Sequence, residues 1–211
     1  MKTDESKKRT RKERERDIHR GEILEAAEKV FAQKGYHAAT IEEIARTADF
    51  GVGTLYNFFR DKNDLYNALV MSLVGRFWEE MEKRIIPLKD PRKALAAMAN
   101  LRFDFFNRHS GLARIMIESM LSGEPRPPCA EARNHDLLRN RYLKVVEKIF
   151  KDGVKKGVFH NFNPAYMALF FDGMITGITI HAAQHEDFKL RRNMACEYIE
   201  KMFITGKDTR R

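Results

Sequence analysis

Hydrophobic residues recur along this chain at intervals of three and four positions, the spacing that places side chains on one face of an α-helix. Capping residues, prolines and glycines separate these periodic segments, as they do at helix ends. Alternating apolar and polar positions, which would indicate a half-buried strand, extend nowhere over a useful length. The pattern therefore predicts an all-α chain of about nine helices.

The N-terminal region contains three of these segments. An apolar stripe predicts a helix that starts near Asp17 and stops at Gly35, because glycine favours helix ends. Thr40 and Glu43 have the capping-box spacing and predict the start of a short second helix. A tight turn follows, and residues 54–59 then predict a third short helix. The stripe of the first helix comprises Ile23, Leu24, Ala27, Val30 and Phe31.

A fourth, long helix is predicted from the candidate cap Asp61 to the helix-ending Pro87. It is apolar on two sides, and a helix of that kind packs against two partners. One stripe comprises Leu65, Leu69, Leu73, Phe77, Met81 and Ile85, and the other comprises Val70, Val74 and Trp78.

Five further helices are predicted over about 91–108, 111–121, 131–156, 164–184 and 188–203. The fourth of these contains residues 165–183, which approach the length of a membrane span. Asp172 lies at the middle of that segment, and a charge at bilayer depth is costly. We therefore expect a helix buried in a bundle and no membrane partner.

Composition and charge narrow the class of protein. The 211 residues carry 39 Lys and Arg against 30 Asp and Glu, a formal net charge of +9. Most of the excess positive charge lies after residue 62. In the N-terminal region, only the run of Lys and Arg between Lys7 and Arg16 indicates a basic arm, and we expect residues 1–16 to be flexible. The two cysteines, Cys129 and Cys196, form neither a disulfide framework nor a C-x-x-C zinc pair. The charged start is not a secretory signal, so we expect a cytoplasmic protein. We also expect that it has no cofactor.

The segment Thr40–Leu65 carries the strongest functional signal. Two short helices joined by a glycine-containing turn predict a helix-turn-helix, whose second helix enters the major groove of DNA. An ordinary helical hairpin is the alternative. The spacing resembles the DNA-binding domain of the TetR/AcrR family of bacterial transcriptional regulators. The residues in register are Thr40, Ile44, Ala45, Ala48, Gly53, Thr54, Tyr56, Phe59, Lys62 and Leu65.

The resemblance is close only over about Ile18–Leu69. Beyond it, helix number and length agree, together with the run Val154–Pro164. In the turn, Asp49-Phe50-Gly51 replaces the Gly-Val-Ser that the family usually has, so a serine cap and phosphate donor are missing. The resemblance therefore implies the fold but not the family's base specificity.

Membership of this family implies a sequence-specific dimeric regulator, usually a repressor. It would bind a palindromic double-stranded DNA operator and be released by a small apolar or amphipathic effector. The resemblance assigns residues 17–62 to the helix-turn-helix domain and residues 63–211 to ligand binding and dimerisation. The implied phosphate contacts are Thr40, Thr54, Tyr56 and Lys62, and the implied base contacts are Val52, Gly53 and Asn57. For Tyr56, a role as a buried core aromatic is the alternative.

The larger domain is expected to contain the effector site and the dimer interface. Aromatic and methionine side chains can line a pocket, although each of them is more often part of the core. The candidate pocket residues are Phe77, Trp78, Phe103, Phe106, Met116, Met120, Phe150, Phe170 and Met174. The candidate interface residues are Phe170, Gly173, Met174, Gly177, Ile178, Met194, Tyr198 and Met202, with packing inside one chain as the alternative.

A helical enzyme or a metal-binding protein is the alternative class. The sequence contains no G-x-S-x-G, H-E-x-x-H or Walker motif. His181 and His185 share one helical face, but a metal site needs further ligands, for which Glu186 and Asp187 are candidates. We expect these histidines to lie at a helix end near the surface and to bind no metal.

Overall fold

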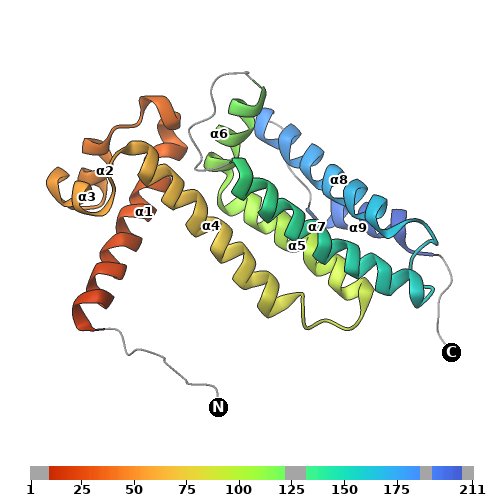
Figure 1. Cartoon of the computed structure of the whole chain (residues 1–211). Helices are drawn as coiled ribbons and strands as arrows, with labels where there is room; N and C mark the ends of the chain where they lie inside the picture. The colour runs from red at the N-terminus through yellow and green to blue at the C-terminus, as the bar shows by residue number, and fades with distance from the viewer. Residues whose placement is uncertain (1–9, 122–131, 186–191, 206–211) are drawn as a thin grey trace, which may run out of the picture. The chain divides into compact units, whose positions relative to one another are not determined.

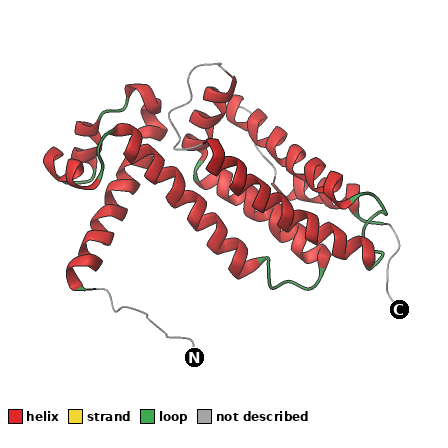
Figure 2. Ribbon diagram, viewed as in Figure 1, coloured by secondary structure: helices red, strands yellow, loops and turns green. Residues whose placement is uncertain are grey.

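The structure, a computed structural model, describes residues 10–121, 132–185 and 192–205. Nine helices and no strand occur within these ranges, so the all-α prediction is confirmed (Figure 2). The chain divides into two compact units, Met1–Val70 and Met71–Arg211. The division lies inside the fourth helix rather than at its start, where the sequence predicted the domain boundary.

The first unit is built from three helices and the start of a fourth. These are α1 (Arg11–Ala38), α2 (Ile41–Thr47), α3 (Val52–Phe58) and α4 (Lys62–Arg84). Gly35 has a φ of 78° and interrupts α1 at the residue predicted to end it, although helical residues resume after it. The predicted stripe of α1 is entirely buried, as are Ile44 of α2 and Leu55 of α3.

Helix α1 begins earlier than the sequence analysis predicted. The Thr10 hydroxyl accepts a hydrogen bond from the Glu13 backbone N–H, and the Glu13 carboxylate accepts one from the Thr10 N–H at 2.7 Å. This capping box satisfies backbone donors at the helix start. The prediction of a flexible arm is therefore wrong for residues 11–16, which are helical, while residues 1–9 lie outside the described ranges.

The second unit is a helical bundle. After the remainder of α4 come α5 (Pro91–Arg108), α6 (Ser110–Leu121), α7 (Ala132–Lys155), α8 (Pro164–Gln184) and α9 (Arg192–Phe203). These bounds lie close to the predicted ones. Helix α7 packs against α5 and α8, and α9 packs against α5 and α8 (Figure 1). Phe103, Phe150 and Phe171 are completely buried in the core of the second unit.

Helix α4 packs into two cores that follow one another along its length. Leu65 and Leu69, at the start of its first apolar stripe, are buried in the first unit, and Met81 and Ile85, at the end of the same stripe, are buried in the second. Trp78 of the other stripe is buried in the second unit as well. The helix therefore has two partners, as predicted, but the two stripes do not divide the partners between them.

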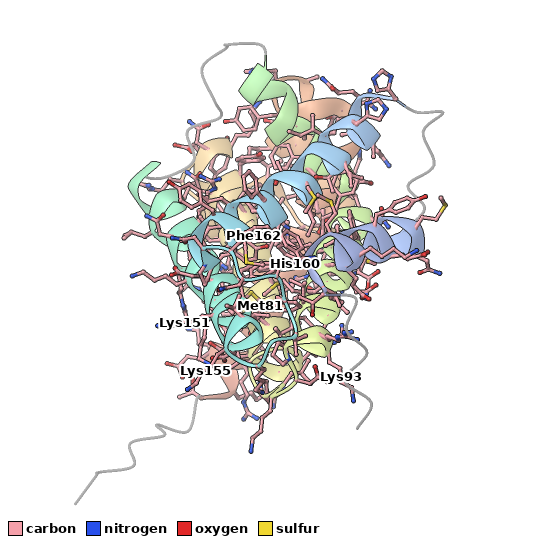
Figure 3. All side chains as sticks on the ribbon, turned by 90° about the vertical axis from the view of Figure 1, so that its right-hand side faces the viewer. Met81, Lys93, Lys151, Lys155, His160 and Phe162 are labelled. Atoms are coloured by element: carbon pink, nitrogen blue, oxygen red, sulfur yellow. The ribbon has the colours of Figure 1, made fainter. Side chains whose placement is uncertain are left out.

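A tight connection joins α7 to α8. Gly157 has a φ of 67°, and the chain folds back so that the Phe159 ring lies over Gly153. The His160 N–H then donates to the Phe203 carbonyl at 3.0 Å, which ties the connection to the end of α9. Figure 3 shows His160 and Phe162 in this connection, while Lys151 and Lys155 project from the last turns of α7.

Helix α8 is, by length and composition, apolar enough to cross a membrane. Its central Asp172 instead forms an ion pair with Arg102 of α5, with 2.7 Å between oxygen and nitrogen. The helix also packs against α5, α6, α7 and α9. These contacts bury one side of α8 in the bundle, but only 33% of its apolar stretch is buried, so the prediction of a buried helix is wrong for its outer face.

Candidate functional sites

The turn between α2 and α3 has the geometry of a helix-turn-helix. Asp49 adopts a left-handed conformation with a φ of 60°, at the position where the family usually has glycine. Aspartate tolerates this conformation better than most residues because its short polar side chain can bond locally. The Phe50 N–H donates to the Ala45 carbonyl at 2.9 Å, and Gly51 caps α3 without a side-chain bond. Helix α3 therefore begins without a side-chain cap at its first turn.

Helix α3 presents a polar, open face to solvent. Leu55 points into the core, whereas Gly53, Tyr56 and Asn57 are exposed and Val52 and Thr54 are half-buried. The Tyr56 side chain is 53% exposed, so the alternative of a core aromatic is wrong. The predicted base-contact residues thus lie together at the start and along the outer side of α3.

Aromatic residues attach the first half of α1 to the helix-turn-helix. The Arg16 guanidinium carbon lies 5.7 Å from the Phe58 ring centre, and that of Arg20 lies 5.2 Å from the Phe59 ring centre. The ring of His19 meets that of Phe50 edge-on at 5.2 Å. Sequence analysis did not explain the apolar Phe58. The structure shows that it supports the basic start of α1 beside α3.

The predicted phosphate contacts have different surroundings. Thr40 is exposed, and its hydroxyl caps α2 by accepting from the Glu43 N–H at 3.2 Å. The Lys62 ammonium donates to the carbonyls of Tyr36, His37 and Ala39 at 3.0 to 3.1 Å. Lys62 therefore closes the end of α1, and a DNA phosphate would share an ammonium group that already has three acceptors.

The second half of the predicted capping box is replaced by an ion pair. The Glu43 carboxylate accepts from the Lys34 ammonium, and this hydrogen bond lowers the pKa of Glu43. Its other oxygen has no hydrogen-bond partner within the described residues. The pair holds α2 against the end of α1, a contact that sequence spacing alone did not indicate.

The candidate pocket residues have different surroundings, and the pocket that they would line stays a prediction. Three are core residues (Trp78, Phe103, Phe150), three are half-buried (Phe77, Phe106, Met174), and the side chains of Met116 and Met120 lie outside the described part. Phe170 is 65% exposed, so its assignment to a pocket within the chain is wrong. It belongs to the outer side of α8, because the neighbouring Phe171 takes the inward position. One groove of about 370 Å³, lined by the α4–α5 connection, the start of α5 and α7, includes none of these residues.

The outer faces of α8 and α9 carry large exposed apolar side chains. Phe170, Met194, Tyr198 and Met202, all predicted interface residues, are between 41% and 65% exposed, and Gly173 and Gly177 are open. Met174 and Ile178 instead pack partly against the core of their own chain. Tyr166 and Leu169 are also exposed on α8 and were missed, although they continue the helical spacing of Phe170.

A buried polar cluster was also missed by the sequence analysis. The Arg102 guanidinium donates to Asp172 at 2.7 Å and to the Thr176 hydroxyl at 3.2 Å, and Arg139 donates to the other Asp172 oxygen at 3.3 Å. The hydroxyl of Tyr142 is buried and has no hydrogen-bond partner among the described residues. The available signal was Asp172 itself, because a carboxylate in an apolar helix requires a partner.

The cluster perturbs its own ionisable groups. Burial raises the pKa of Tyr142 to about 12, although the nearby Arg102 charge acts in the opposite direction. Burial alone would lower the pKa of Arg102, but Tyr142 and the Asp172 carboxylate hold it above its ordinary value. Tyr142 is therefore neutral and Arg102 charged at physiological pH, and both offer hydrogen-bond donors.

The histidine pair lies at the end of α8. The ring centres of His181 and His185 are 4.3 Å apart. Within the described ranges, no group of three or more His, Cys, Asp or Glu side chains is placed to hold a metal ion. Glu186 and Asp187 lie outside those ranges.

Comparison with known proteins adds a family assignment. The profile of the family described as "Bacterial regulatory proteins, tetR family" matches residues 23–69. The fatty acid metabolism regulator protein of Bacillus subtilis is 30% identical over 138 residues, covering 64% of this chain and 68% of that protein. The transcriptional activator FasR of Mycolicibacterium smegmatis is 34% identical over 111 residues, covering 53% of this chain and about half of FasR, 51%.

A solved structure shows the same fold over nearly the whole chain. The crystal structure of AibR in complex with isovaleryl coenzyme A and operator DNA superposes with a TM-score of 0.67. The match covers 88% of this chain and 98% of AibR at 20% identity. The likeness therefore extends past the helix-turn-helix to the helices of the second unit.

Proposed function

Because this chain belongs to the TetR family of bacterial regulatory proteins, we propose that it is a dimeric regulator of transcription that binds a palindromic DNA operator. The observation that carries this proposal is the helix-turn-helix of the first unit. There, Leu55 anchors α3 while Gly53, Tyr56 and Asn57 face solvent. A short helix held from behind and open in front can enter a major groove.

Base recognition is assigned to the outer side of α3. Asn57 can accept from and donate to adenine in a bidentate pair, and Val52 can contact a thymine methyl group. Gly53 has no side chain and leaves room for close approach of the backbone, since a Cβ there would meet nothing within 4 Å.

Phosphate contacts are assigned to hydroxyl groups and to the basic start of α1. Thr40 and Tyr56 are exposed and carry hydroxyls that can donate to phosphate oxygens. Arg11, Arg14 and Arg16 are exposed on α1, and the contact of Arg16 with Phe58 places the end of this basic stretch beside α3. These contacts position the protein on DNA without specifying sequence.

Dimerisation is assigned to the outer faces of α8 and α9. Single exposed apolar residues are common on monomeric proteins, but α8 and α9 expose several large ones. Groups of exposed apolar residues mark interaction surfaces. Two copies joined in this way could enter major grooves about 34–36 Å apart, which a palindromic site requires.

Effector control is assigned to the second unit. AibR, which shares the fold, is described in complex with both isovaleryl coenzyme A and operator DNA. We assign a small apolar or amphipathic effector to the present chain as well, with DNA release as its consequence. The effector can shift the DNA-binding equilibrium only by its difference in affinity for the two states. As a bacterial DNA-binding regulator, the protein acts in the cytoplasm, by operator binding and not by catalysis.

Selection of bound sequences from a random DNA library, using the purified full chain, tests the proposed function. We expect enrichment of an inverted repeat, with an affinity that falls steeply as salt concentration rises. Recovery of random sequences only, at every salt concentration, would refute specific operator binding and favour the alternative of a helical enzyme. A promoter–reporter fusion carrying the selected site then distinguishes repression, the expected outcome, from activation.

A further inference from the structure

Among the described side chains, the polar cluster in the second unit has more positive than negative charge. Asp172, with its side chain 9% exposed, faces both Arg102 from α5 and Arg139 from α7. Arg102 is largely buried and paired with this carboxylate, whereas the Arg139 side chain is 56% exposed. Arg139 can therefore turn to a further negative group that arrives from solvent, and a charge-assisted hydrogen bond of that kind is a strong one.

Tyr142 adds a hydrogen-bond donor with no acceptor. Its hydroxyl is buried without a partner among the described residues, and the guanidinium of Arg102 stacks over its ring at 5.0 Å. The neighbouring Arg102 guanidinium can only donate to this hydroxyl, so the hydroxyl proton has no acceptor among the described residues, and an unmatched buried donor destabilises the folded state. Arg102, Arg139 and Tyr142 thus converge as donors, which suits an oxygen acceptor that carries negative charge.

Aromatic side chains continue from the cluster. The ring of Phe77 lies 6.3 Å from that of Tyr142 and 5.3 Å from that of Phe105, centre to centre. Phe77 and Phe105 are only half-buried, unlike the fully buried core residue Phe103. A charged, donor-rich group therefore adjoins apolar surface that the chain does not fully cover.

We propose that this cluster binds the anionic oxygen group, a carboxylate or a phosphate, of an amphipathic effector whose apolar part packs on Phe77 and Phe105. The proposal deepens the proposed function by naming the chemical class of the effector. The link between effector binding and DNA release rests on the proposed function. The binding site itself does not, because effector binding can be measured without DNA. A purely apolar molecule would leave the Tyr142 hydroxyl and the excess charge unmatched.

Calorimetric titration of the full chain tests the proposal with three probes. Octanoate supplies a carboxylate, octanoyl coenzyme A supplies phosphates, and 1-octanol supplies the same apolar chain without charge. We expect at least one anionic probe to bind about tenfold or more tightly than 1-octanol, because hydrogen bonds to charged groups are the stronger ones. The anionic probe that binds distinguishes a carboxylate from a phosphate source.

Two variants locate the binding group, and a third serves as a control. Tyr142→Phe removes only the hydroxyl, and Arg139→Gln removes the excess charge from a side chain that is 56% exposed. Each is expected to weaken the anionic probe about tenfold. Arg141→Gln makes the same change two residues further along α7, where the guanidinium stacks on Trp78 and is 59% exposed. It is expected to leave the affinity unchanged.

A merely structural role for the cluster predicts different results. Removal of an unsatisfied hydroxyl would then leave the melting temperature of Tyr142→Phe equal or raised, with probe affinity as in the unaltered chain. Unchanged affinity in both Tyr142→Phe and Arg139→Gln, equal binding of 1-octanol, or binding of neither anionic probe overturns the proposal. Cluster-dependent binding that fails to release operator DNA upholds the site and refutes only the effector part of the proposed function.

Discussion

Single residues in the first unit have environments that decide their function. Lys62 lies at the start of α4, where its ammonium group reaches three carbonyls at the end of α1 and also stands 4.8 Å from the Tyr36 ring centre. Asn57, in contrast, projects from α3 into solvent. The first residue therefore stabilises the unit, and the second is free for recognition.

Replacement of Lys62 by alanine should destabilise the first unit by about 1–3 kcal/mol, because three carbonyls lose a charged donor. Hydrogen exchange measured by mass spectrometry over residues 23–59 should show faster exchange in the variant. Lys83→Ala is the matched control, since the Lys83 side chain is 70% exposed and its ammonium lies 3.9 Å from the Glu79 carboxylate. That change should cost about 0.5 kcal/mol or less. Equal exchange in the two variants would contradict a structural role for Lys62.

A separate measurement, the salt dependence of operator binding, tests the predicted phosphate contact of Lys62. If the ammonium also reaches a phosphate, the slope of log affinity against log salt should fall by about one in Lys62→Ala. An unchanged slope, with weaker binding, would assign the whole effect to stability.

Replacement of Asn57 by alanine should relax the choice at one base pair. The expected cost on the selected operator is about 1–3 kcal/mol, with a smaller loss on operators altered at that pair. Fluorescence anisotropy on a set of single-base operator variants measures this difference. Tyr56→Phe is the comparison, because loss of a phosphate contact should weaken all operators alike. Uniform weakening by Asn57→Ala would remove Asn57 from the base contacts.

At the scale of elements, short helices in this protein depend on contacts from their neighbours. Helix α3 has seven residues, and a helix of that length is marginal in isolation. Leu55 anchors it to the core, while contacts of Phe58 with Arg16 join its end to α1. The end of α7 is fixed in a similar way, by the Phe159 ring over Gly153 and the bond from His160 to α9.

Gly153→Ala should destabilise the second unit by about 1–3 kcal/mol or more. The added Cβ would lie 2.0 Å from Cδ2 of Phe159, whose side chain is 1% exposed. Urea unfolding followed by circular dichroism measures the loss. Gly75→Ala on α4 is the control, because a Cβ there meets nothing within 4 Å and should stabilise the helix by about 0.5–1 kcal/mol. A Gly153→Ala protein as stable as the Gly75→Ala protein would disprove the close approach.

At the scale of the whole molecule, the proposed function requires two copies of the chain. A palindromic operator is matched by a two-fold symmetric dimer, and a C2 interface uses the same patch from both subunits. The exposed apolar residues of α8 and α9 supply a patch of this kind, with Phe170, Tyr198 and Met202 the most exposed members of the predicted interface.

Phe170→Glu should convert the dimer to a monomer at micromolar concentration. Each subunit would bring an unpaired carboxylate into the apolar interface, and burial of an unpaired charge is costly. Sedimentation velocity measures the mass, and operator affinity should fall in parallel. Ile86→Glu is the control, since Ile86 is 54% exposed outside α8 and α9. Two variants of equal mass, or a native chain that sediments as a 24.7 kDa monomer, would refute this interface.

The sequence by itself determined where the helices lie and which segment holds the helix-turn-helix. Those features depend on neighbours three or four positions apart, so stripes such as Ile23–Phe31 and caps such as Thr40 can be read directly. The predicted start of α1 is too late because residues 11–16 have no apolar stripe, although Thr10 and Glu13 have the capping-box spacing.

Only the tertiary structure decided which distant groups meet. Arg102 and Asp172 are 70 positions apart, and no local spacing indicates that they pair inside the bundle. Folding likewise gave Lys62 its three carbonyl acceptors, and turned Phe171 inward and Phe170 outward. Spacing within a helix fixes which residues share a face, but the packing of other helices fixes which face is covered.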